Sequence, residues 1–164
     1  MAQASSVQAE SIKVSRSGPA YVVDADFHSP AGADLTFEVF TDYDHMASYV
    51  PNLGVSEIME KSGTLWKVHQ KGTLKLSLFS LDMESVREIR LAPPFAIDSR
   101  GLTGDFKRLE SHTTFEVESG GVRVHYHAES EPRFPLPPLV GPALIRRQVA
   151  EQFTAMLNEI QKRQ

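Results

Sequence analysis

The fold is decided by residues 101–163. They read GLTGDFKRLESHTTFEVESGGVRVHYHAESEP over 101–132, RFPLPPLVGP over 133–142 and ALIRRQVAEQFTAMLNEIQKR over 143–163. Polar and apolar residues alternate in the first part, which predicts antiparallel strands. The last part predicts a helix from Pro142 to Arg163, because proline is tolerated at the first helical position. One face of this helix is an apolar stripe, formed by Ile145, Val149, Phe153, Met156, Leu157 and Ile160.

The preceding sequence supplies the rest of a sheet. Residues 12–27 alternate as strands around the turn signal at 17–19, and residues 33–50 show two short stretches with helical spacing. From 55 to 133, strand patterns follow one another with turn residues between them. Such short connections favour an antiparallel meander, because parallel strands need long crossovers. We therefore expect an α+β domain in which about six or seven curved strands wrap the C-terminal helix.

Composition excludes several classes of protein. The 164 residues include 17 Lys and Arg against 21 Asp and Glu, which gives a net charge of −4. Proteins that neutralise nucleic-acid phosphates carry a basic surplus, so we expect no nucleic-acid partner. The chain contains no cysteine, which excludes disulfides and thiolate chemistry.

The N-terminal sequence MAQASSVQAESIK has neither the basic nor the apolar region of a secretory signal. No apolar run approaches the roughly 20 residues that a membrane-spanning helix needs. We therefore expect a cytoplasmic protein with a flexible tail over residues 1–10 and a single domain over 11–164. The sequence leaves the oligomeric state open, with a dimer among the alternatives.

The order of elements resembles a known family. A strand, two short helices, an antiparallel run and a long C-terminal helix resemble the helix-grip fold of the START-like superfamily, also called SRPBCC. This superfamily includes polyketide cyclase/dehydrase-like and coenzyme Q-binding proteins. The segments that carry the resemblance are FTDYDHMASYVPNLGVSEIM (40–59), GLTGDFKRLESHTTFEV (101–117), GGVRVHYHAESEP (120–132) and RRQVAEQFTAMLNEIQKR (146–163).

The resemblance implies a ligand cavity between the sheet and the last helix. We expect the cavity to be lined by bulky apolar side chains: Trp66, Val68, Phe79, Met83, Phe95, Phe115, Tyr126, Phe153 and Met156. Many relatives carry a bulky aromatic residue shortly before the equivalent of Phe115. This chain has Thr113 and Thr114 there, which would widen or polarise the cavity.

No residue pattern marks a metal or cofactor site. His125 and His127 share one face of a strand, but Val122 and Val124 occupy the inward phase, which places both histidines outside and Tyr126 inside. Spacing supplies no third ligand. Glycine-rich phosphate loops and nucleophile motifs are absent from the sequence as well. We therefore expect neither a metal nor a cofactor.

The charged run Asp82, Glu84, Arg87, Glu88 and Arg90 offers a carboxylate pair in Asp82 and Glu84. We interpret the run as cross-strand ion pairs on a solvated face.

Three functions remain as hypotheses. The first is binding or carriage of a small hydrophobic molecule, such as a lipid, a quinone or a polycyclic compound. The second is a cyclase or dehydratase acting on a polyketide-like substrate, with Tyr126, His69 or Arg100 as acid, base or oxyanion partner. The third is a protein-interaction module. Binding leads, because no catalytic pattern is visible in the sequence.

Overall fold

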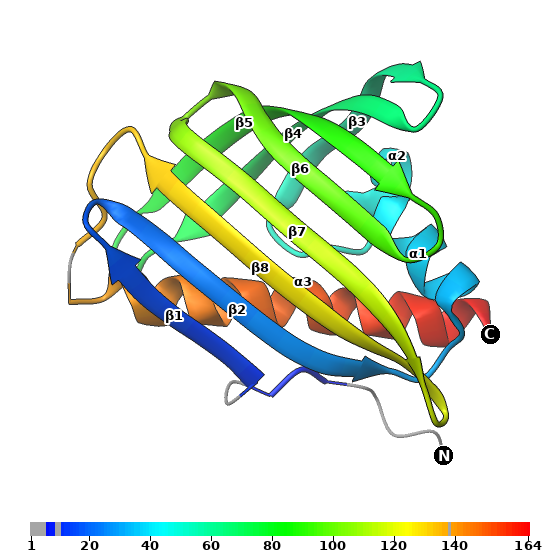
Figure 1. The fold of residues 1–164 in the computed structure, drawn as a ribbon. Coiled ribbons are helices and arrows are strands. Elements are labelled where there is room, and N and C mark those ends of the chain that lie inside the picture. The colour runs from blue at the N-terminus through cyan, green and yellow to red at the C-terminus, as the bar shows by residue number, and fades with distance from the viewer. Residues whose placement is uncertain (1–5, 9–10, 138) are drawn as a thin grey trace.

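The structure is a computed structural model that describes residues 6–8, 11–137 and 139–164. A curved sheet wraps one long helix (Figure 1). Its strands are β1 (Ile12–Ser17), β2 (Ala20–Ser29), β3 (Leu53–Ser62), β4 (Leu65–Lys75), β5 (Ser80–Ala92), β6 (Ala96–Gly104), β7 (Phe106–Glu118) and β8 (Gly121–Pro132). The helices are α1 (Ala33–Thr41), α2 (Tyr43–Met46) and α3 (Gly141–Arg163).

The eight strands form one open antiparallel sheet in the order β1-β2-β8-β7-β6-β5-β4-β3. This architecture confirms the predicted α+β helix-grip fold. The number of strands is higher than the six or seven expected, for two reasons. Residues 12–17 form a hairpin strand of their own, and the stretch LKLSLFSLDMESVREIRL is divided by a turn at residues 76–79 into the end of β4 and all of β5 up to Leu91.

Helix α3 lies against the concave face of the sheet because its apolar stripe is buried there. Phe153, Met156, Leu157 and Ile160 are all buried. Two arginines attach its first turns to the sheet: Arg146 Nε donates to the Ile12 carbonyl at 3.3 Å and Arg147 Nη2 to the Lys75 carbonyl at 3.0 Å.

At the other end of α3, Arg163 Nη2 donates to Asp42 Oδ2 at 2.7 Å, between α1 and α2. The helix is therefore fixed to the rest of the protein at both ends. Within the described part of the chain, no helix is long and apolar enough to cross a membrane.

The main hydrophobic core lies where α1, α3 and the middle of the sheet meet. Phe27, Phe40 and Phe153 form its aromatic centre, with the Phe27 and Phe153 ring centroids 4.9 Å apart. The expected flexible tail falls largely on residues 1–5 and 9–10, which lie outside the described residues. Within that stretch, Val7 is buried and its N–H donates to Thr154 Oγ1 on α3 at 3.0 Å.

Candidate ligand cavity

A cavity of about 270 Å³ lies between α3 and strands β4 to β8. This is close to the lower limit of ligand pockets, about 300 Å³, so it suits a compact molecule better than a long-chain lipid. Part of its wall is apolar, formed by Phe40, Met46, Leu53, Leu74, Met83, Ile97, Phe106, Leu109, Phe153 and Met156. The helix also presents two polar side chains to the cavity, Gln148 and Gln152.

The structure brings together some of the side chains predicted to line a cavity. Met83, Tyr126, Phe153 and Met156 all line it. That they contact a ligand stays a prediction.

The other predicted residues lie elsewhere. Val68 and Phe115 are buried in the main core, where Phe115 packs edge-on against Phe40 at 5.2 Å. Trp66 packs against Tyr43, with ring centroids 6.4 Å apart, and so supports the cavity wall from behind. Phe79 and Phe95 are 60% and 53% exposed and are not among the residues that line the cavity.

The most unusual side chain of the cavity is Arg87. Its Nη1 donates to Ser99 Oγ at 3.2 Å and its Nη2 to Gln70 Oε1. Gln70 is held in turn by a hydrogen bond from its Nε2 to Ser56 Oγ at 3.0 Å. The Nε atom of Arg87 is buried without any hydrogen-bond partner. Its charge therefore faces the cavity without a carboxylate partner among the described residues.

Local backbone geometry explains how an arginine comes to face inward. Strand residues alternate between faces, and Arg87 shares the inward phase of β5 with the buried residues Ser85 and Ile89. The register between β5 and β6 also shifts beside it, because Val86 pairs with Thr103 whereas Arg87 pairs with Gly101. The extra residue of this bulge is Leu102 on β6, so the bulge interrupts the alternation of β6 beside Arg87, whereas β5 keeps its own alternation.

Two phenols accompany the guanidinium. Tyr43 and Tyr126 both line the cavity, and neither phenolic oxygen has a hydrogen-bond partner among the described residues. Burial raises the pKa of both phenols, and this outweighs the lowering effect of the nearby Arg87 charge. Both therefore remain protonated at neutral pH and can donate a hydrogen bond to a ligand.

The departure at Thr113 also falls on the cavity. Thr113 is buried and lines the wall next to Tyr126, its direct partner across β7 and β8. A hydroxyl in place of a bulky ring leaves room and adds polarity at this point. Together with Ser85, Ser99 and Ser111, it makes one side of the cavity polar.

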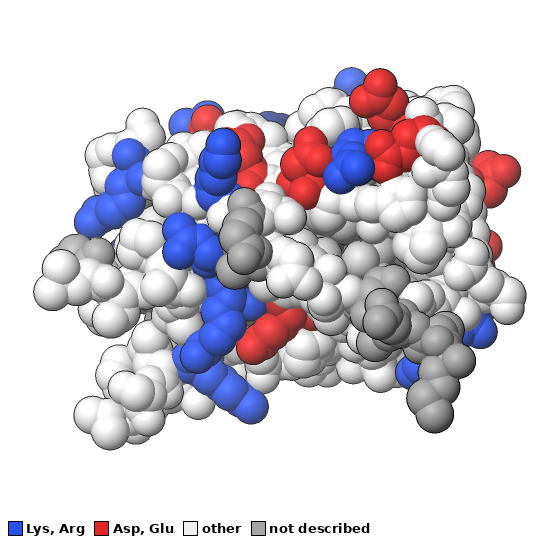
Figure 2. Space-filling view, turned by 90° about the horizontal axis from the view of Figure 1, so that it is seen from below, with Lys and Arg blue, Asp and Glu red and all other residues white. Residues whose placement is uncertain are grey.

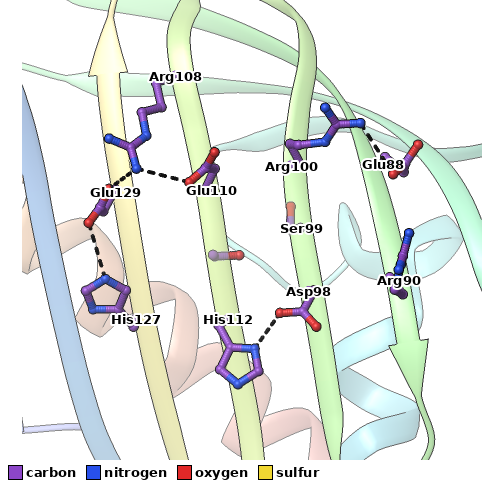
Figure 3. A pocket seen from close by; sticks show the side chains of 11 residues that line it. Glu88, Arg90, Asp98, Ser99, Arg100, Arg108, Glu110, His112, His127 and Glu129 are labelled. Carbon is purple, nitrogen blue, oxygen red and sulfur yellow. Dashed lines mark hydrogen bonds and ion pairs between the residues drawn. The ribbon is translucent and has the colours of Figure 1, made fainter.

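The outer face of the sheet carries a different, open groove of about 450 Å³ (Figure 3). Most of its charged side chains pair with one another: Arg100 with Glu88 at 3.6 Å, Arg108 with Glu110 at 3.2 Å and also with Glu129, and His112 with Asp98. These pairs are open to solvent, so the groove resembles a surface ion-pair network rather than a ligand site.

The proposed catalytic roles of His69 and Arg100 do not fit this geometry. His69 hydrogen-bonds Glu57 at 2.9 Å and Glu84 at 2.6 Å, on the face of β4 opposite to the buried Val68. Arg100 lines the outer groove. Of the three residues considered, only Tyr126 reaches the cavity.

The histidines of the outer face are each paired with acids. His125 Nδ1 lies 2.6 Å from Asp26, and His127 Nδ1 lies 2.7 Å from Asp24. Across the described ranges, no cluster of three or more histidine or acidic side chains has the arrangement of a metal site.

Sequence reasoning missed Arg87, because it assigned the whole charged run from Asp82 to Arg90 to the solvated face. Strand parity was the available signal. Asp82, Glu84, Glu88 and Arg90 are even-numbered, whereas Arg87 is odd and shares its phase with Met83, Ile89 and Leu91.

The fold and the cavity together define a helix-grip protein with an interior pocket. The chain belongs to the family described as polyketide cyclase / dehydrase and lipid transport, which residues 29–157 match. No curated protein matches the sequence.

Solved structures share the fold. The Zhui aromatase/cyclase from Streptomyces sp. R1128 is 17% identical, with a TM-score of 0.73 over 88% of this chain and 95% of that one. The STAR-related lipid transfer protein from Xanthomonas axonopodis (fragment 25–204) is 11% identical, with a TM-score of 0.73 over 92% and 99%. A START superfamily protein from Mycobacterium smegmatis is 12% identical, with a TM-score of 0.72 over 87% and 99%. Such low identities establish the fold alone.

Proposed function

We propose that this protein binds a compact, mainly apolar molecule that carries one acidic or carbonyl oxygen. The observation that supports this most directly is Arg87, whose guanidinium faces the cavity with a buried, unpaired Nε. Arg87 has no carboxylate partner among the described residues, so a ligand oxygen that accepts from its guanidinium gains a charge-assisted hydrogen bond. The apolar part of the wall binds the remainder of the molecule.

The absence of cysteine also leads us to propose a cytoplasmic location.

The size of the cavity narrows the ligand further. A volume of about 270 Å³ accommodates one or a few fused rings more readily than an extended acyl chain. Tyr43 and Tyr126 can donate to the same oxygen or to a second one, since both phenols are protonated. Aromatic carboxylic acids and polycyclic phenols or ketones meet these requirements.

The test is a binding comparison between acidic ligands and their neutral isosteres. We expect a library of aromatic carboxylates to raise the melting temperature more than the matching amides or esters. Arg87→Met removes the charge while keeping the length of the side chain. It should weaken binding of the acid about 10- to 150-fold, because a hydrogen bond to a charged group contributes about 1.5–3 kcal/mol.

The matched control is Arg90→Met, a substitution on the same strand but on its outer face. It should leave affinity for both ligands unchanged. Equal affinities of Arg87→Met for the acid and the isostere, with no loss relative to the unaltered protein, would refute the proposal. So would a protein that no lipophilic compound stabilises. Native mass spectrometry of gently purified protein offers an independent readout of a co-purifying ligand.

The second candidate function is catalysis of ring closure or dehydration on a polyketide-like substrate. It is favoured by the proximity of Arg87 to two protonated phenols. A guanidinium can stabilise the oxyanion of an enolate, and a phenol can supply a proton to the oxygen that leaves or becomes a hydroxyl. Tyr126→Phe should then lower kcat on a linear polyketone substrate with little change in KM. Failure of the protein to accelerate cyclisation of any bound polyketone would leave binding alone.

A further inference from the structure

Three connections and the first turn of α3 meet at one end of the molecule. The turn between β1 and β2, residues 133–137 and 139–140, and the start of α3 lie there together (Figure 1), and the turn between β4 and β5 is attached to them. A second, small hydrophobic cluster of Tyr21, Leu74, Leu136 and Leu144 holds these segments together. The hydrogen bond from Arg147 to the Lys75 carbonyl joins the end of β4 to the helix. We call this region the loop end.

Large apolar side chains project from the loop end into solvent. Leu78 and Phe79, between β4 and β5, are 93% and 60% exposed, and Leu139 and Val140, just before α3, are 96% and 48% exposed. Scattered exposed apolar residues are normal in proteins, but apolar tips gathered from two segments of one end form a surface feature.

Several cations on the segments of the loop end, or next to them in the sequence, have no ion-pair partner among the described residues. Arg16, Lys75, Arg133, Arg146 and Arg147 all belong to the connections of the loop end or to strand and helix residues next to them. None of the five makes an ion pair within the described part of the chain. Figure 2 shows most of the Lys and Arg side chains of this view in its left half, the half that holds the loop end.

Elsewhere on the surface some cations are paired with carboxylates, whereas others, such as Lys71 and Arg90, have no ion-pair partner among the described residues. On the outer face of the sheet, Arg100, Arg108 and Arg123 each pair with carboxylates. The loop end therefore combines exposed apolar tips with uncompensated cations in a protein whose net charge is −4.

We propose that the loop end docks on the surface of an anionic lipid membrane. Apolar tips inserted among lipid headgroups, with Lys and Arg above them, are the arrangement by which proteins lie on such surfaces. The positive charges of the loop end favour a negatively charged surface, such as an anionic membrane, over a neutral apolar partner. Separate projecting tips suit a fluid interface, whereas a protein partner would require a continuous face with fixed relief.

Docking through the loop end would bring the ligand cavity close to the membrane. Leu74 belongs both to the cluster beneath the loop end and to the wall of the cavity, and Met83 packs against the same cluster and lines the cavity too. A docked protein would thus hold its cavity beside the lipid phase, from which an apolar ligand can enter. This part of the inference rests on the proposed binding function.

Vesicle sedimentation tests the proposal. We expect the protein to sediment with vesicles that contain phosphatidylglycerol and not with vesicles of phosphatidylcholine alone, and to be released by high salt. The triple variant Leu78→Ser, Phe79→Ser, Leu139→Ser should lower the partition coefficient about tenfold or more. The matched control is Met59→Ser, Val117→Ser, at residues 56% and 68% exposed on other parts of the sheet. It should sediment as the unaltered protein does.

Two variants separate this proposal from the proposed ligand binding. Arg87→Met should lose affinity for the acidic ligand in solution and still sediment with anionic vesicles. The triple variant should show the reverse. Membrane docking would be overturned if the unaltered protein did not sediment with anionic vesicles, or if the triple variant sedimented with them as well as the unaltered protein does. The proposed ligand site would not be affected by either result. Light scattering that shows a dimer converted to a monomer by the triple variant would also overturn membrane docking, because the tips would then form an interface between two copies.

Discussion

The rings of Tyr126 and Phe153 meet edge to face, with centroids 4.9 Å apart and planes inclined at 75°. One residue belongs to β8 and the other to α3, so this contact joins the sheet to the helix at the cavity wall. Phe153 also stacks on Phe40 at 5.8 Å, on its core side. A single side chain therefore serves both the hydrophobic core and the binding cavity.

Replacement of Phe153 should accordingly affect stability and binding together. Phe153→Ala should lower the free energy of unfolding by about 3–5 kcal/mol, because a buried aromatic ring is lost and a void remains. Urea denaturation measures this change. Phe79→Ala is the control, since a side chain that is 60% exposed should change stability by less than about 0.5 kcal/mol. Equal losses in the two variants would contradict the packing described here.

Gly104 should resist substitution more than an ordinary strand glycine. Its φ of 125° is rarely adopted by other residues, and a Cβ atom there would lie 2.2 Å from the Glu84 carbonyl oxygen. Gly104→Ala should destabilise the protein by more than about 1 kcal/mol. Gly54→Ala is the control, since the nearest atom to its Cβ would be 3.8 Å away. Thermal unfolding of both variants makes the comparison.

The contact between Asp42 and Arg163 should contribute measurably to stability. Burial raises the pKa of Asp42, but hydrogen bonds from His45 and Arg163 outweigh it and leave the pKa below 3.8. We expect a double-mutant cycle with Asp42→Asn and Arg163→Met to give a coupling energy of about 1–2 kcal/mol.

The pH dependence of this pair follows from the direction of the shift. A carboxyl whose pKa is lowered on folding stabilises the protein above its unfolded pKa and loses that contribution as pH falls through the folded value. The coupling should therefore be complete at neutral pH and should disappear in strong acid, below pH 3.8. A coupling that persists in strong acid would exclude the ionic origin.

His127 should titrate above its ordinary range. Its hydrogen bond to Asp24 is the largest cause that raises its pKa above 6.5. The associated stability is complete below 6.5 and is lost as pH rises through the raised value. Asp24→Asn should bring the pKa of His127 down, as followed by NMR titration of the ring protons. Asp34→Asn, on α1, should leave it unchanged.

The sequence allowed α3 to be predicted because its stripe depends on local periodicity alone. Proline at Pro142 and apolar residues from Ile145 to Ile160 needed no knowledge of the sheet. The turn at residues 76–79 was not found, since Leu76, Leu78 and Phe79 are apolar and read as continuous strand. In the sequence, apolar residues of an exposed turn show the same alternation as the buried residues of a strand, so the two cannot be told apart.

The cavity was predictable in location but not in chemistry. Parity places Arg87 and Tyr126 on the inner face of their strands, yet it does not say that β5 and β8 face one cavity. Phe79 and Phe95 were predicted to line the cavity and do not, because both lie in turns just before a strand begins, where alternation does not determine burial. Which residues line the cavity is determined in each example by contacts between elements that are distant in the sequence.

The attachment of α3 at both ends determines how the cavity can open. Helix α3 cannot rotate about either end without breaking hydrogen bonds, those of Arg146 and Arg147 at its start or that of Arg163 at its end. Gln148 and Gln152, which line the cavity, lie between these two attachments. Passage of a ligand would therefore strain the middle of the helix, and a stiffer span would slow exchange without weakening equilibrium binding.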